Sequence, residues 1–168
     1  MRRFTMLAIC LLALAGFTAG TAWAQSSGAH FQHGTPSAAI QSNGNLTVSW
    51  VEAGLGNLDV TYTLTGHVDA TYFCVTHSGS IPDANNKHTV STTGQTNGSF
   101  KPKNGKVTAS LTLVAPPAPV SEPPTCGSGQ TLALQSITWS NVVLTDTSNN
   151  VTANVTSGTF SITLFPAP

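Results

Sequence analysis

The stretch from Cys126 to Thr147 constrains the fold more than any other part of the chain. A cysteine and a Gly-Ser-Gly turn precede a long run of β-branched and aromatic residues, which favour a pleated, half-buried strand. The apolar residues of this run change parity twice, from Leu132 and Leu134 to Ile137 and Trp139 and then to Val142 and Leu144. Because a slip of one residue turns every later side chain to the opposite face, we predict irregularities near Gln135–Ser136 and Ser140–Asn141. The stretch therefore predicts architecture, and it contains no recognisable chemistry.

The first 24 residues have the organisation of a cleaved secretory signal. Arg2 and Arg3 form a basic start, and the apolar run Phe4–Ala15 is too short to span a bilayer comfortably. Ala22-Trp23-Ala24 then fits the small-x-small cleavage rule. We therefore predict a secreted, extracellular protein of residues 25–168, with no membrane span after signal cleavage.

The mature chain carries few charges and no arginine. Removing Arg2 and Arg3 from the six basic residues leaves four lysines against six acidic residues, a formal charge of −2. Lys101–Lys106 is the one small basic cluster, whereas nucleic-acid binders need clustered cations to displace phosphate counterions. We expect no nucleic-acid partner.

Short alternating segments separated by turns predict an all-β domain. Clean alternation occurs at 46–50, 58–64, 68–74, 107–113 and 160–164, and no helical period follows the signal. Gly66 is expected to separate two strands, 94–105 to be rich in turns with room for one short strand at Ser99–Lys101, and the Pro-rich segment 115–124 to be a surface loop. Residues 25–43 form a loose N-terminal segment with one edge strand near Ser37–Gln41. Residues 44–168 are then predicted to form a single antiparallel β-sandwich, immunoglobulin-like, of about 8–10 strands, with a closed barrel as the alternative.

Two cysteines remain after the signal is removed. Cys74 is in phase with Val68, Ala70 and Tyr72 on the apolar side of its strand, and Cys126 precedes the organising stretch. An exported chain meets an oxidising compartment, so we predict a Cys74–Cys126 disulfide.

Several landmarks together resemble a family of small uncharacterised secreted bacterial proteins. They are Ala53-Gly-Leu-Gly56, Tyr72-Phe-Cys-Val75, Asn85-Asn-Lys87, Cys126-Gly-Ser-Gly-Gln130 and Asn141-Val-Val-Leu-Thr-Asp-Thr147. The resemblance runs from about Leu46 to Leu164. It implies a secreted all-β domain and no activity.

The five histidines are the candidate metal ligands. His30 and His33 flank two residues near the N-terminus, and His67, His77 and His88 lie elsewhere. A strand would point His30 and His33 to opposite faces, so exposed, metal-free histidines are the simpler interpretation, and we expect no metal and no cofactor.

A second plausible cleavage site, Ser27-Gly28-Ala29, suggests an alternative role in copper binding for one of the histidines. Cutting there would make His30 the N-terminal residue, a feature that resembles the copper site of copper-dependent polysaccharide monooxygenases. A small copper oxidoreductase is therefore one alternative function.

Catalytic groups are not evident in the sequence. It has no Gly-x-Ser-x-Gly elbow, and its six scattered acids offer no obvious pair for glycoside hydrolysis. Asp146, between two threonines, is interpreted as a turn-forming side chain and not as a base. We predict no catalytic residue.

Two tryptophans and two tyrosines on alternating segments could form a sugar-stacking platform, but their phase favours the core: Trp50, Tyr62, Tyr72 and Trp139. The leading hypothesis is a non-catalytic structural or binding protein outside the cell. A carbohydrate- or surface-binding module is the first alternative, with polysaccharide or a cell-surface component as its partner.

Overall fold

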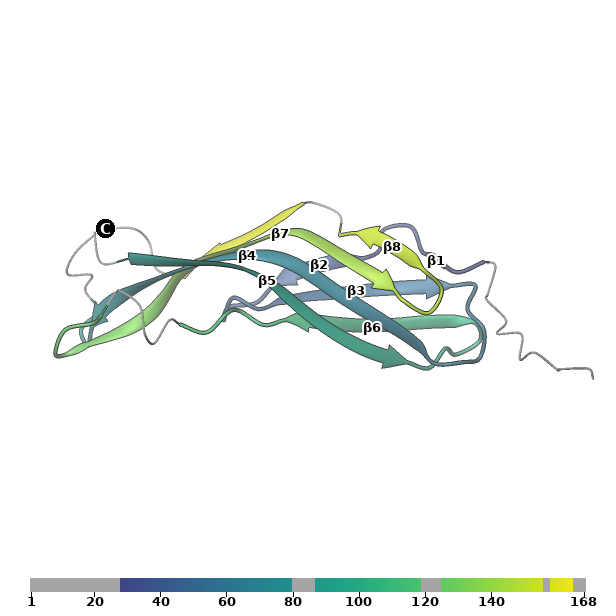
Figure 1. Ribbon diagram of the computed structural model, residues 1–168, viewed down its shortest axis with the longest axis horizontal. Coiled ribbons are helices and arrows are strands. Elements are labelled where there is room, and N and C mark those ends of the chain that lie inside the picture. The colour runs from purple at the N-terminus through teal and green to yellow at the C-terminus, as the bar shows by residue number, and fades with distance from the viewer. Residues whose placement is uncertain (1–27, 80–86, 119–124, 156–157, 165–168) are drawn as a thin grey trace, which may run out of the picture.

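The computed structural model describes residues 28–79, 87–118, 125–155 and 158–164, and in these ranges it contains nine strands in two antiparallel sheets (Figure 1). Sheet A contains β1 (His30–Phe31), β2 (Ser37–Ile40), β3 (Leu46–Ala53) and β6 (Lys106–Leu113). Sheet B contains β4 (Val60–Thr76), β5 (Lys87–Phe100), β7 (Gln130–Asp146), β8 (Val151–Asn154) and β9 (Thr159–Thr163). The predicted all-β sandwich is confirmed. The signal at 1–24 and the 119–124 part of the Pro-rich loop lie outside the described residues.

The two sheets are unequal in length. In sheet A, β6 pairs along the whole of β3 on one side, while β1 and β2 share its other side. In sheet B, the 17-residue strands β4 and β7 form the centre, β5 flanks β4, and β8 and β9 share the far side of β7. Figure 1 shows the long strands of sheet B continuing past the end of sheet A.

The core lies between the inner faces of the sheets. Alternate residues of β3, β4 and β7 are buried because each strand turns every second side chain inward. The largest fully buried side chains are Trp50, Trp139, Tyr62, Phe73 and Leu46. The Trp139 indole also donates a hydrogen bond of 2.9 Å from Nε1 to the Gly44 carbonyl, which fastens the β2–β3 turn to sheet B.

Strand β7 has irregularities at both predicted places. Thr71 pairs with Ser136 and the next residue of β4 pairs with Leu134, so Gln135 is the extra residue. The second register shift lies beside Asn141, whose φ is +51°. Each shift restores the apolar side chains of β7 to the core face, which is the physical reason for both.

Two glycines predicted to break strands lie inside them instead. Strand β4 runs through Gly66, and β5 runs through Gly94 as far as Phe100, so the predicted turn-rich character of residues 94–98 is wrong. Ser99 and Phe100, from the short strand considered at Ser99–Lys101, do lie in β5. A Cβ on Gly66 would lie 2.9 Å from Leu113 Cδ1, and one on Gly94 would lie 2.9 Å from Trp139 Cζ3. These glycines give space to core side chains and do not form turns.

The N-terminal segment is tied to sheet A. Strand β2 confirms the edge strand predicted near Ser37–Gln41, and the two-residue strand β1 pairs with Glu52 and Ala53. A Cβ on Gly54, where φ is +76°, would collide with the backbone of Gly28.

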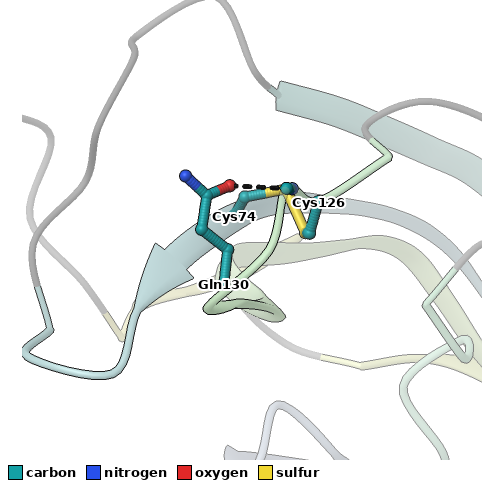
Figure 2. Close-up of a disulfide and its surroundings, with 4 residues drawn as sticks. Cys74, Cys126 and Gln130 are labelled. Atoms are coloured by element: carbon teal, nitrogen blue, oxygen red, sulfur yellow. Dashed lines mark hydrogen bonds between the residues drawn. A yellow bond between two sulfur atoms is a disulfide. The ribbon is translucent and has the colours of Figure 1, made fainter.

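The predicted disulfide joins Cys74 to Cys126 with a Cα–Cα distance of 5.4 Å across 52 positions of sequence (Figure 2). Cys74 is buried on the inner face of β4, in the predicted phase. Beyond it, Gly127 donates a backbone hydrogen bond of 3.2 Å to Gln130 Oε1. The bond therefore anchors the chain that enters β7 to the far end of β4.

Candidate binding surface and buried acid cluster

The outer face of sheet B, the hydroxyl face, is covered with hydroxyl groups. Its hydroxyl-bearing residues are Thr61, Thr63, Thr65, Thr71, Thr89, Ser91, Thr93, Ser99, Ser136, Thr138, Ser140, Thr145, Thr152, Thr159, Ser161 and Thr163. None of them is buried. They arise because β4, β5 and β7 place threonine or serine at most outward positions, where β-branched threonine suits a strand.

Strand register arranges these side chains in rows. Four rows cross four strands each: Thr89–Thr71–Ser136–Thr163, Ser91–Asp69–Thr138–Ser161, Thr93–His67–Ser140–Thr159 and Asn97–Thr63–Thr145–Thr152. Neighbours within a row are about 4.8 Å apart, and the first three rows follow one another at about 6.8 Å, the spacings of paired strands and of alternate residues. The fourth row lies about twice as far from the third, because the row with Gln95, Thr65 and Val143 comes between them. The face is therefore a repeating array of polar groups.

Hydrogen bonds between neighbouring strands hold part of this array in place. Thr71 and Thr89 are linked at 3.0 Å between their Oγ1 atoms, and Thr138 Oγ1 and Ser161 Oγ at 2.9 Å. Ser91 donates to Asp69 Oδ1 at 2.6 Å.

Charge on the four rows is confined to one pair. His67 Nε2 lies 3.4 Å from Asp69 Oδ1, and the other row members are uncharged. The face thus combines fixed hydroxyl groups with almost no net charge.

A groove of about 390 Å³ crosses the outer face of sheet A. Its floor includes the cross-strand row Ser37–Ser49–Ser110. Thr35 closes one side, where its hydroxyl donates to the Gln32 carbonyl at 2.8 Å. The groove is a second candidate surface, on the sheet opposite the hydroxyl face.

The four aromatic residues considered for sugar stacking are in the core. Trp50, Tyr62 and Trp139 are at most 1% exposed and Tyr72 is 5% exposed, as their phase indicated. Trp50 and Tyr62 pack with ring centroids 4.8 Å apart. These side chains offer no exposed stacking platform.

Two acidic side chains are also completely buried. Glu52 continues the inward phase of Trp50 on β3, and Asp146 continues that of Leu144 on β7. Asp146 accepts hydrogen bonds from the backbone amides of Ser148 at 2.8 Å and Asn149 at 3.0 Å. It also accepts one from Asn149 Nδ2 at 2.6 Å. The prediction that Asp146 forms a turn is confirmed.

Glu52 lacks comparable partners. Both of its carboxylate oxygens, the Tyr62 hydroxyl and Trp50 Nε1 are buried without a hydrogen bond of normal geometry to any described residue. Tyr62 and Asp146 nevertheless lie near enough to affect the Glu52 carboxyl. Such unpartnered buried polar groups are rare in native proteins.

The Glu52 carboxyl stays neutral up to a higher pH than an ordinary glutamate does. The pKa of Glu52 is raised to about 7, mainly by burial and also by Asp146, while Tyr62 and His30 act in the opposite direction. Burial, followed by the influence of Glu52, raises the pKa of Tyr62 well above its ordinary value. The sequence interpretation missed this pair, although the inward phase of Glu52 and Asp146 was visible in the alternation of their strands.

The candidate histidine ligands are dispersed through the fold. His30 Nδ1 is 2.6 Å from the Gly28 carbonyl, His77 Nδ1 is 2.8 Å from the Gly129 carbonyl, and His67 lies on the hydroxyl face. Within the described ranges, no three His, Cys, Asp or Glu side chains gather as a metal site would require.

No family model, curated protein or solved structure matches this chain. In the described part of the chain, no helix is long and apolar enough to cross a membrane.

Proposed function

We propose that this chain is a secreted, non-catalytic binding protein whose hydroxyl face contacts a neutral polysaccharide outside the cell. The observation that carries the proposal is the set of four-strand polar rows, in which donors and acceptors repeat across β5, β4 and β7. A polysaccharide also presents repeating hydroxyl groups, so successive sugars can exchange hydrogen bonds with successive side chains.

The near-absence of charge on the hydroxyl face favours a neutral ligand. The rows carry one His67–Asp69 pair and no lysine or arginine, so they offer an anionic polymer little attraction. Such binding would be weak for each sugar, because a hydrogen bond exchanged with water contributes only about 0.5–1.5 kcal/mol net. Avidity along an extended chain is therefore part of the proposal.

Secretion is the remaining part of the proposal. The basic start, the apolar run and Ala22-Trp23-Ala24 support secretion, and the Cys74–Cys126 disulfide is compatible with an oxidising compartment.

The test is retention of residues 25–168 on insoluble cellulose, chitin and starch, with anionic alginate beads for comparison. We expect retention on at least one neutral polymer and little on alginate. Thr138→Lys, in the middle of the hydroxyl face, should abolish retention. Thr108→Lys makes the same change on the outer face of sheet A and should leave it intact.

The two lysine variants also assign the surface. Loss of retention with Thr108→Lys alone would move the site to the groove of sheet A. Absence of retention on every neutral polymer, by a chain that remains folded, would overturn the proposal.

A further inference from the structure

The two buried acids belong to opposite sheets. Glu52 projects from β3 of sheet A and Asp146 from β7 of sheet B. Asp146 lies near enough to Glu52 to raise the pKa of its carboxyl. Asp146 already accepts three hydrogen bonds from Ser148 and Asn149, so its oxygens are engaged as acceptors. A proton shared by the two acids is therefore placed on Glu52, whose oxygens are buried without a hydrogen bond of normal geometry to any described residue.

We propose that Glu52 and Asp146 form a proton-controlled clasp between the two sheets, closed while Glu52 carries its proton and released at β1 when that proton is lost. A neutral Glu52 can be buried beside an ionised Asp146 and can donate toward it. An ionised Glu52 leaves two like charges in an apolar interior, and this arrangement is strongly unfavourable without water.

Strand β1 is the weakest cover over Glu52. It pairs with β3 at only two positions, Phe31 with Glu52 and His30 with Ala53. On the other side of β3, β6 pairs at eight positions, and β4 and β7 pair with each other over most of their length. Displacing β1 is thus the least disruptive way to bring water to an ionised Glu52.

The other titratable groups around the clasp are few. Tyr62 faces Glu52 from β4, His30 comes from β1, and on β6 the charged residue at this end is the exposed Lys106. The described residues of β5 and β8 bring no charged side chain to this end, where Phe100 and Val151 lie. A protonated His30 favours the ionised Glu52 and so acts against closure.

Hydrogen exchange measured by mass spectrometry tests the clasp in residues 25–168. Peptides covering 28–35 report on β1, where the Gln32 amide donates to the Val51 carbonyl at 2.9 Å. Comparing the native chain with Glu52→Gln at each pH cancels the intrinsic pH dependence of exchange. Peptides from the centre of β4 and β7 serve as an internal control.

We expect the two chains to exchange alike at β1 near pH 5. By pH 7 the native chain should exchange faster at β1, by up to about 100-fold. The reason is that the population of an open state that requires ionised Glu52 increases about tenfold per pH unit. The central peptides should show no such divergence. A rate ratio that stays constant with pH would overturn the proposal.

Two further measurements keep the result decisive. If His30→Gln removed the pH dependence, the histidine would be the sensor and the clasp would be wrong. If Glu52→Gln did not fold, carboxyl NMR of the native chain would decide: Glu52 must titrate near neutrality, and the β1 amides must shift with the same midpoint. Titration of Glu52 near its ordinary range would overturn the proposal.

Discussion

Trp139 of β7 fills the space above the bare backbone of Gly94 on β5. A Cβ at Gly94 would lie 2.9 Å from Trp139 Cζ3 and 3.0 Å from Cη2, closer than such contacts allow. The indole is held in place at its other end by the hydrogen bond to Gly44. It cannot retreat from an added methyl group without disturbing the β2–β3 turn.

Gly94→Ala should therefore destabilise the protein by about 1–3 kcal/mol, the usual effect of overpacking a core. Gly56→Ala is the matched control, because nothing lies within 4 Å of a Cβ at that position. Urea unfolding of the two variants beside the native chain measures the difference. Equal midpoints for Gly94→Ala and Gly56→Ala would contradict the close packing of Trp139 on Gly94.

Strand positions were predictable from alternation, and strand lengths were not. The parity changes around Gln135 and Asn141 located both irregularities of β7, because a core face must be kept. The predictions at Gly66 and Gly94 were wrong because the sequence does not distinguish a glycine that makes room for a neighbouring side chain from one that forms a turn. The difference lies in Leu113 and Trp139, which are distant in sequence from the glycines that they contact.

Loss of the Cys74–Cys126 bond should lower stability substantially. Closing a separation of 52 residues is worth roughly 4 kcal/mol on the chain-entropy model. Cys74→Ala should reduce the melting temperature of residues 25–168 and leave Cys126 reactive to thiol reagents. Titration of the unfolded, unreduced native chain should find no free thiol, and two free thiols would show that the bond does not form.

Gly54→Ala should detach the N-terminal segment. The new methyl group meets the backbone of Gly28 and also disfavours the φ of +76°. Gly79→Ala is the control, since Gly79 has a φ of +80° but no atom within 4 Å of its added Cβ. Both variants carry the left-handed backbone penalty of about 1–2 kcal/mol. Only Gly54→Ala should speed proteolysis before Phe31, and equal cleavage in both would contradict the contact with Gly28.

The hydroxyl face and the acid pair differ in how far sequence reveals them. Once β4, β5 and β7 are recognised, their outward threonines follow from alternation, but the rows need the register between strands. The proximity of Glu52 and Asp146 depends on the packing of sheet A on sheet B, which no local pattern encodes. The inward phase of both acids was the available signal.

The stability of the protein should depend on pH through Glu52. Its pKa is raised from 4.5 to about 7 in the folded chain, mainly by burial, so the folded protein holds a proton that the unfolded chain releases. The stabilisation is fully present below pH 4.5 and is lost as pH rises to about 7. It amounts to roughly 3 kcal/mol, since one pKa unit corresponds to about 1.4 kcal/mol. Above pH 7 both states are ionised and this contribution is constant.

Glu52→Gln isolates this contribution because the amide stays neutral at every pH. The free energy of unfolding of Glu52→Gln, minus that of the native chain, should increase by roughly 3 kcal/mol between pH 4.5 and 7 and then level off. Urea unfolding at half-unit steps from pH 4 to 8 measures it, and the remaining acids and histidines cancel in the difference. A difference that is flat with pH, or that rises only below pH 5, would mean that Glu52 ionises in the folded protein as it does in water.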